Sequence, residues 1–159
     1  MIHVVVGDLA SVPADAVVRP ATTWLEPLTA ALRRLDDAAG PRFQEQRRLS
    51  RELPTGSAVV TGAGDLAAEF VVHVVLGATE ADVVADAVRR ATEAACWQCK
   101  QWQIQTLATA VPPGDTLATM AGALRAHMQN ATHPANVLFV VATAAEAETL
   151  KAHLGQGDA

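Results

Sequence analysis

Six short apolar runs with many β-branched residues, each about as long as a β-strand, most constrain how this chain can fold. Residues with branched β-carbons favour extended backbone, and runs of this length between turn residues are typical of strands. The sequence therefore predicts about six strands. The runs are IHVVV (2–6), DAVVR (15–19), SAVVT (57–61), FVVHVVL (70–76), IQTLATAV (104–111) and NVLFVVA (136–142).

Amphipathic helical patterns separate several of these runs. Apolar stripes at helical spacing extend over residues 28–39, 84–99 and 117–128, and the first leaves Arg33, Arg34, Asp36 and Asp37 on its polar side. A capping box, TAAE (143–146), predicts the start of a last helix, and Gly155 is its expected end. Strands that alternate with helices predict an α/β fold. We expect a three-layer α/β/α sandwich around a mixed sheet of about six strands.

The 159 residues contain no internal repeat and no linker before the final GQGDA. We therefore expect a single domain over residues 1–154 and a C-terminal tail over residues 155–159. Half of the residues are apolar and the net charge is −5, which favours a globular protein and argues against nucleic acid as a partner. The arginine-containing segment RFQEQRRLSR (42–51) is interpreted as a solvated helix face.

The first ten residues, MIHVVVGDLA, have too short an apolar run and no basic flank for a signal peptide or a membrane span. We expect a cytoplasmic protein with no membrane partner. Both cysteines lie in CWQC, late in a predicted helix, where the helix dipole does not lower a thiol pKa. None of the five histidines is spaced to complete a zinc site. We expect Cys96 and Cys99 to be buried or inert, and no metal or cofactor.

Ligands of such folds bind at the carboxyl ends of the strands. Four stretches are predicted to lie there: GDLA (7–10), RPATTW (19–24), VPPGD (111–115) and ATAAE (142–146). A fifth stretch, GAGDLA (62–67), fits a relaxed dinucleotide-binding pattern. The strand predicted from Phe70 leaves no room for a crossover helix after it, so a tight connection is favoured there.

Several short motifs, in their order, resemble the macro domain, the ADP-ribose-binding module, over about residues 2–154. VVVGDLASVPADAVV (4–18) is similar to the opening of that family, and AAGP (38–41), PTG (54–56) and VVH (71–73) are similar to motifs of its middle segment. The resemblance implies that the Asp8 carboxylate accepts the adenine amino group, with support from the Leu9 N–H. A simple turn after the strand is the alternative role of Asp8.

The stretches that hold the phosphates in the family differ here. The family's Asn-Ala-Ala-Asn is matched by Arg19, Pro20, Ala21 and Thr22, so Thr22 replaces the asparagine that serves the distal ribose and hydrolysis in many members. Glu26 and Pro27 stand in place of a glycine run. Proline has no N–H and glutamate repels phosphate, so Pro27 is predicted to begin a helix instead. Arg19 is expected to offer the phosphates a replacement donor.

The second phosphate loop of the family is matched by residues 112–114, which follow Val111, and Asp115 is the expected N-cap of the next helix. Thr143 stands where an aromatic ring often stacks on adenine. The resemblance thus gives seven predicted ligand-binding residues and no catalytic one. They are Asp8, Leu9, Arg19, Thr22, Val111, Gly114 and Thr143.

No other chemistry stands out, since neither a G-x-S-x-G nor an H-E-x-x-H motif occurs. His73 is expected to be a hydrogen-bonded core residue, and Asp15 to make a structural turn contact. Our leading hypothesis is a weak binder of ADP-ribose or a related adenine-containing ligand, with little or no activity as an ADP-ribosyl hydrolase. The alternative is a macro-like scaffold with a closed pocket that acts through protein contacts or homo-oligomerisation. Trp97, on the polar side of its helix, slightly favours that alternative.

Overall fold

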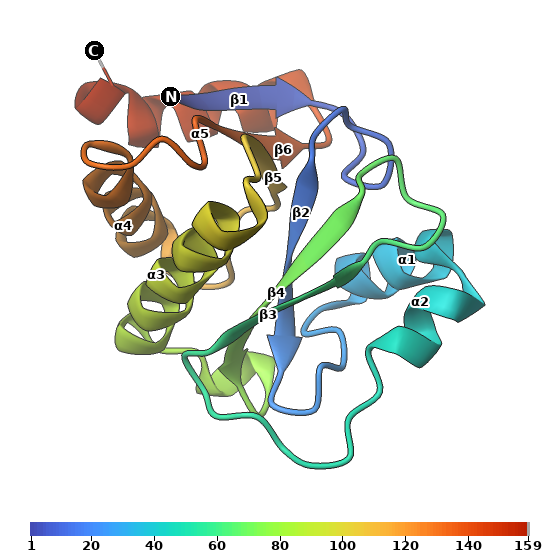
Figure 1. The fold of residues 1–159 in the computed structure, drawn as a ribbon. Coiled ribbons are helices and arrows are strands. Elements are labelled where there is room, and N and C mark those ends of the chain that lie inside the picture. The colour runs from blue at the N-terminus through green and yellow to red at the C-terminus, as the bar shows by residue number, and fades with distance from the viewer. Residues whose placement is uncertain (159) are drawn as a thin grey trace.

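The protein is described by a computed structural model, which covers the backbone of residues 1–158 and the side chains of residues 1–155. Six strands form one sheet, and helices flank it (Figure 1). The strands are β1 (Ile2–Val6), β2 (Ala16–Thr22), β3 (Ala58–Gly62), β4 (Phe70–Gly77), β5 (Thr106–Thr109) and β6 (Asn136–Val141). The helices are α1 (Ala30–Ala39), α2 (Pro41–Gln46), the 3₁₀ turn η1 (Glu80–Asp82), α3 (Ala85–Trp102), α4 (Leu117–Met128) and α5 (Ala144–Asp158).

The strand order in the sheet is β1-β6-β5-β2-β4-β3. Five strands are parallel to one another, and β3 alone is antiparallel to its neighbour β4. This confirms the predicted mixed sheet. The connection between β3 and β4 spans residues 63–69 and holds no helix, so GAGDLA is the tight connection expected from its length.

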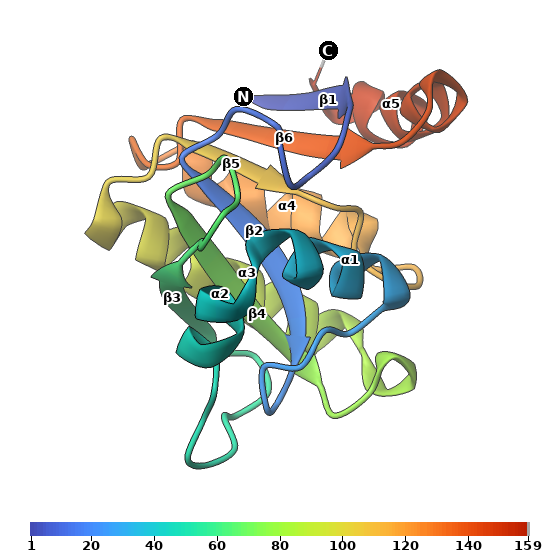
Figure 2. The same ribbon diagram turned by 90° about the vertical axis from the view of Figure 1, so that its right-hand side faces the viewer.

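Helices cover both faces of the sheet, as Figure 2 shows: α1 and α2 lie on one face, and α3 and α4 lie on the other. Helix α5 lies along the edge strand β1 (Figure 1). The central strands β2 and β4 are buried on both faces, because side chains that alternate up and down all meet a helical layer. The predicted three-layer α/β/α architecture is therefore present, with its core between these layers.

Several boundaries differ from the sequence-based expectations. Strand β2 continues through Pro20 to Thr22, so most of RPATTW belongs to a strand rather than a loop. Helix α1 begins after Thr29, whose hydroxyl accepts from the Leu32 N–H at 3.4 Å, so Pro27 does not begin the helix. Helix α4 begins after Thr116, whose hydroxyl bonds to the Pro113 carbonyl at 2.6 Å, so Asp115 is not its N-cap.

The last helix also differs at its end. The capping box forms as predicted at its start, where the Thr143 hydroxyl accepts from the Glu146 N–H at 3.1 Å. The Glu146 carboxylate in turn accepts from the Ala142 N–H at 3.1 Å. The helix continues beyond Gly155 to Asp158, so Gly155 does not end it.

No helix in the described part of the chain is long and apolar enough to cross a membrane. Cys96 and Cys99 are buried in α3, as predicted, and neither takes part in a disulfide. Burial raises the pKa of each thiol to about 12, so both are uncharged at neutral pH. Among the described residues, no group of histidine, cysteine or acidic side chains could hold a metal ion.

Candidate functional site

A groove of about 570 Å³ lies at the carboxyl ends of the parallel strands, where folds of this type bind ligands. We call it the strand-end groove. Its walls come from residues 7–10 after β1, from one side of α1 within residues 29–38, from residues 110, 111 and 113 after β5 and from residues 140–142 at the end of β6. Pro20 and Glu80 complete its lining. The exposed Trp24 does not line the groove, and Pro113 forms part of its wall without closing it.

Asp8 and Leu9, two of the predicted ligand-binding residues, line this groove. Asp8 is exposed, and one carboxylate oxygen, Oδ1, accepts from the Ala10 N–H at 3.0 Å. Its carbonyl oxygen accepts from the Ser11 and Val12 N–H groups at 3.0 and 2.9 Å. The turn role that we kept as an alternative is therefore real. The second carboxylate oxygen has no hydrogen bond to any described residue, so the turn leaves it available to a donor in the groove.

Thr22 does not line the groove, because it closes a tight turn over residues 22–26. Its hydroxyl oxygen accepts from the Trp24 N–H at 3.2 Å and from the Glu26 N–H at 3.1 Å. The backbone adds two more bonds, from the Leu25 N–H to the Thr22 carbonyl and from the Thr22 N–H to the Glu26 carbonyl, both at 2.9 Å. Four N–H groups of this turn are thus used inside the turn.

Leu25 explains why the turn is stable without glycine. Its φ of 58° lies in the left-handed region, which costs an ordinary residue about 1 kcal/mol or more. Its side chain is only 1% exposed and packs in a small cluster with Ala21 and Val75. Complete burial of a leucine contributes about 1.5–3 kcal/mol, which offsets the backbone strain.

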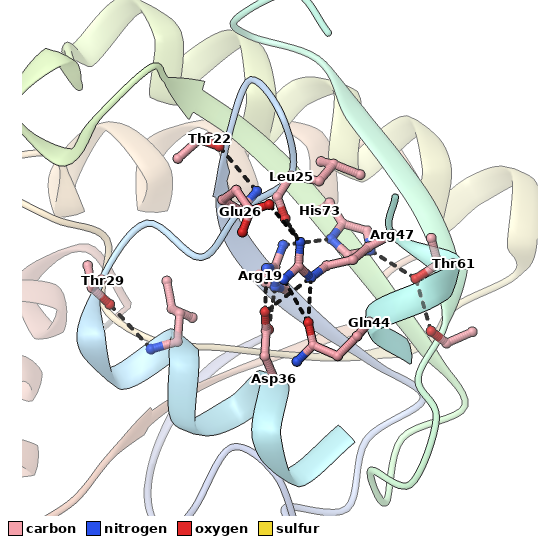
Figure 3. A network of polar contacts seen from close by, with 12 residues as sticks. Arg19, Thr22, Leu25, Glu26, Thr29, Asp36, Gln44, Arg47, Thr61 and His73 are labelled. Atoms are coloured by element: carbon pink, nitrogen blue, oxygen red, sulfur yellow. Dashed lines mark hydrogen bonds and ion pairs between the residues drawn. The ribbon is translucent and has the colours of Figure 1, made fainter. Parts of the chain in front are cut away.

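The structure corrects our expectation for Arg19. This side chain is fully buried in β2, on the side covered by α1 and α2, and does not face the groove (Figure 3). Its Nε and Nη2 atoms each lie 2.7 Å from one carboxylate oxygen of Asp36 on α1. The ring of Phe43 lies 5.6 Å from the guanidinium carbon. The guanidinium donates its hydrogen bonds to residues of the core, so Arg19 does not contact a phosphate in the groove.

Asp36 is the residue that the sequence analysis placed wrongly. We assigned it to the polar side of its helix, but it is 2% exposed and lies with Leu32, Leu35 and Ala39 on the buried side of α1. These spacings of three and four residues identify Asp36 as a charge on the apolar stripe. That pattern was the signal for a buried partner.

A second arginine also reaches Asp36, from the end of α2. Arg47 Nε lies 3.2 Å from Asp36 Oδ2, and Nη1 donates to the Leu25 carbonyl at 3.2 Å (Figure 3). The Arg47 side chain is only 12% exposed and also contacts Gln44 and Glu26. The solvated helix face predicted for residues 42–51 is therefore wrong for Arg47, which fastens the 22–26 turn to the core.

His73 is a hydrogen-bonded core residue, as predicted. Its Nδ1 lies 3.2 Å from Arg19 Nη1, and its Nε2 lies 2.9 Å from the Thr61 hydroxyl. Because a guanidinium can only donate, Nδ1 accepts and Nε2 carries the proton. Burial, and then the positive charges of Arg19 and Arg47, hold the pKa of His73 well below its usual value. The imidazole is neutral and is not a candidate catalytic acid.

The other predicted positions divide between two grooves. Val111, 40% exposed, lines the strand-end groove and also a second groove of about 790 Å³ between α4 and α5, and Gly114 lines only the second one. Thr143 caps α5 and lines neither groove. Asp15 makes the structural contact we expected, because its Oδ2 accepts from the Gln105 and Thr106 N–H groups at 2.9 and 3.0 Å.

The sequence analysis missed several residues on the groove wall, above all Thr29, Arg34 and Glu80. The signal for Arg34 was its spacing, because Ala31, Arg34 and Ala38 recur every three or four residues and lie on one side of α1. No comparable pattern marked Glu80, which the fold brings to the groove from the segment after β4.

Sequence comparisons show the protein family to which this chain belongs. A model of the Macro domain family matches residues 30–113, more than half of the chain. An O-acetyl-ADP-ribose deacetylase of Citrobacter rodentium is 40% identical over 78 residues, which are 46% of this chain and 44% of that protein. In three of the curated relatives, the matched part covers between 39% and 44% of their length.

Solved structures show the same fold over almost the whole chain. The Trypanosoma brucei macrodomain in complex with ADP-ribose superposes with a TM-score of 0.81 at 17% identity, over 97% of this chain and 69% of that one. The Oceanobacillus iheyensis macrodomain with ADP gives a TM-score of 0.72 at 20% identity, over 96% and 91%. Fold and groove together define an α/β/α module with a groove at its strand ends. The chain belongs to the macro domain family.

Proposed function

We propose that the strand-end groove binds ADP-ribose or a related adenine-containing ligand weakly, and that the protein has little or no hydrolase activity. The observation that supports this most is the combination of an open groove carrying the exposed Asp8 carboxylate with a 22–26 turn in which four N–H groups are already bonded. The first feature favours adenine recognition. The second removes donors that a diphosphate would need.

The adenine end is proposed to depend on Asp8. A carboxylate only accepts hydrogen bonds, and the exocyclic amino group of adenine only donates them. Asp8→Asn keeps an oxygen for the Ala10 N–H but can present its NH₂ group to the adenine. We expect this variant to bind ADP-ribose at least about tenfold more weakly, with a nearly unchanged melting temperature. Asp37→Asn, an exposed change on α1 outside the groove, is the control.

The phosphate end is proposed to be weak. Residues 112 and 113 are prolines without N–H groups, and Pro27, directly after the 22–26 turn, is a third. Each lost charge-assisted bond is worth about 1.5–3 kcal/mol, so we expect a Kd for ADP-ribose of roughly 0.1 mM or weaker. Titration calorimetry measures this directly. A micromolar or tighter Kd would contradict our account of the loops.

Catalysis is expected to be at background level. Hydrolysis needs water and ribose in a near-attack geometry, and a displacement of about 1 Å can cost around a hundredfold in rate. The Thr22 hydroxyl faces the turn and bonds to Trp24 and Glu26 there, which leaves it poorly placed to hold a ribose. The assay uses mono-ADP-ribosylated protein, ADP-ribose-1″-phosphate and O-acetyl-ADP-ribose, the last because of the name of the Citrobacter rodentium relative. Robust turnover that Thr22→Ala abolishes would overturn this proposal.

A second candidate function is a scaffold that acts through protein contacts, including contacts with its own copies. The observation that favours it is Trp97, which is 57% exposed on α3 among charged side chains. Large exposed aromatic residues are common anchors of interfaces. Sedimentation analysis of the protein and of Trp97→Gln tests this candidate. A monomer at all concentrations in both would argue against self-association.

A further inference from the structure

The strand-end groove carries three charged side chains, Asp8, Glu80 and Arg34. Arg34 is the one cation among the described residues that line it. Its side chain is exposed and forms no ion pair or hydrogen bond with any described residue. Arg19 and Arg47, by contrast, are both directed onto Asp36. The groove therefore has one positive group that is not already neutralised by the protein.

Arg34 lies near the middle of the groove along α1. Ala31 and Ala38 also line the groove, about one turn before and one turn after it. The Ala38 end of α1 is close to the Asp8 loop, because Asp65 N–H bonds to the Ala39 carbonyl and Ala67 N–H bonds to the Ala10 carbonyl. The other end of α1 meets the groove at Thr29. A guanidinium in the middle can therefore reach a group that lies between the Asp8 end and the Thr29 end.

We propose that Arg34 is the main contact for the phosphate of the bound ligand and makes the groove selective for adenine nucleotides over uncharged adenosine. This inference rests on the proposed binding function. The planar guanidinium donates two parallel hydrogen bonds to a phosphate, which a lone backbone N–H cannot do. A side-chain cation thereby takes over a task for which the 22–26 turn has few N–H groups left, because four of them are bonded inside the turn.

The other two charged side chains of the groove are negative and repel a phosphate. Asp8 and Glu80 are both carboxylates, and the whole chain carries a net charge of −5. Without Arg34, the charged side chains that line the groove would all repel a phosphate. Removal of Arg34 should thus affect phosphorylated ligands strongly and uncharged ones little.

The test measures binding of ADP-ribose, ADP, adenosine and inorganic pyrophosphate to the wild-type protein, Arg34→Gln and Arg33→Gln by calorimetry or ligand-observed NMR. Arg33 is the matched control, because it is an exposed arginine on the same helix that does not line the groove. We expect Arg34→Gln to weaken ADP-ribose, ADP and pyrophosphate about tenfold and to leave adenosine unchanged. Arg33→Gln should change all four less than twofold, and Arg34→Lys should restore part of the loss.

The outcomes separate this inference from the proposed function. If ADP-ribose binds the wild-type protein and Arg34→Gln equally well, the role of Arg34 is wrong while the binding function stands. A second outcome is that Arg34→Gln weakens pyrophosphate binding, while adenosine does not bind and Asp8→Asn leaves ADP-ribose binding unchanged. This outcome would support the role of Arg34 and contradict adenine recognition by Asp8. Equal losses in Arg33→Gln and Arg34→Gln would indicate only a general charge effect and would overturn the inference. Absence of all binding overturns both.

Discussion

Arg19 on β2 and Asp36 on α1 form a two-pronged ion pair in the core, with both N–O distances at 2.7 Å and almost no exposure of either side chain. Arg47 joins the same carboxylate from α2 and extends the network to the 22–26 turn. The Asp36 carboxylate therefore binds two guanidinium groups, on the side of the sheet that α1 and α2 cover (Figure 3). This network fixes the helix that forms one wall of the strand-end groove.

Loss of the Asp36 charge should strongly destabilise the fold. Asp36→Asn leaves the buried Arg19 guanidinium without its counter-charge, and breaking a buried pair in this way costs about 3–5 kcal/mol. We expect a loss of free energy of unfolding in that range, measured by chemical denaturation. Asp37→Asn, one residue further along the same helix and exposed, should change stability by less than about 0.5 kcal/mol. Similar values for the two variants would show that the pair is not important for stability.

The turn closed by Thr22 should depend on its hydroxyl group. Thr22→Val removes the acceptor for the Trp24 and Glu26 N–H groups while keeping the shape of the side chain. We expect a loss of about 1–3 kcal/mol in the free energy of unfolding. Thr22→Ser, which keeps the hydroxyl, should retain most of the stability. Equal losses in both variants would mean that the methyl group and not the hydroxyl supports the turn.

His73 should make the protein less stable in mild acid. Its pKa in the folded protein is held well below the value of about 6.5 that it has when unfolded, mainly by burial. Between these two values the unfolded chain binds the extra proton, so this contribution to stability is present above about pH 6.5 and is lost as the pH falls below it. The slope approaches 1.4 kcal/mol per pH unit.

The measurement for His73 compares the free energy of unfolding of the wild-type protein and of His73→Gln between pH 7.5 and pH 5. The glutamine keeps an acceptor for Arg19 and does not titrate. The difference in stability between the two proteins should shrink as the pH falls. A constant difference over this range would contradict the assignment of a neutral imidazole.

The cysteines should be unreactive while the protein is folded. Burial raises the pKa of Cys96 and of Cys99 to about 12, and the thiolate is the reactive form. At pH 8 we expect a thiol-specific colorimetric reagent to label the folded protein far more slowly than the protein in denaturant. Fast labelling of the folded protein would mean that α3 opens readily around these residues.

Much of the fold followed from the sequence because local patterns carry it. Apolar runs with β-branched residues marked all six strands, and the stripes at 84–99 and 117–128 located α3 and α4 closely. The 3₁₀ turn η1 was missed, since it is too short to show a helical period. The short helix α2 (Pro41–Gln46) overlaps the helix face that the sequence analysis expected over residues 42–51, but it ends earlier. The predicted helix starts at Pro27 and Asp115 failed because neighbouring threonines, Thr29 and Thr116, precede the helices instead.

By itself, the sequence determined the α/β class, the family, the position of Asp8 at a strand end and the absence of a glycine-rich phosphate loop. The direction of individual side chains was decided only by the tertiary structure. Arg19 and Asp36 both carry full charges, which local rules place in solvent, and only the packing of α1 on β2 makes each the partner that lets the other be buried. The same packing turned Arg34 toward the groove. A charged side chain is stable only where water or an opposite charge surrounds it. For Arg19 the opposite charge is Asp36, seventeen residues away in the chain, so local sequence rules could not identify it.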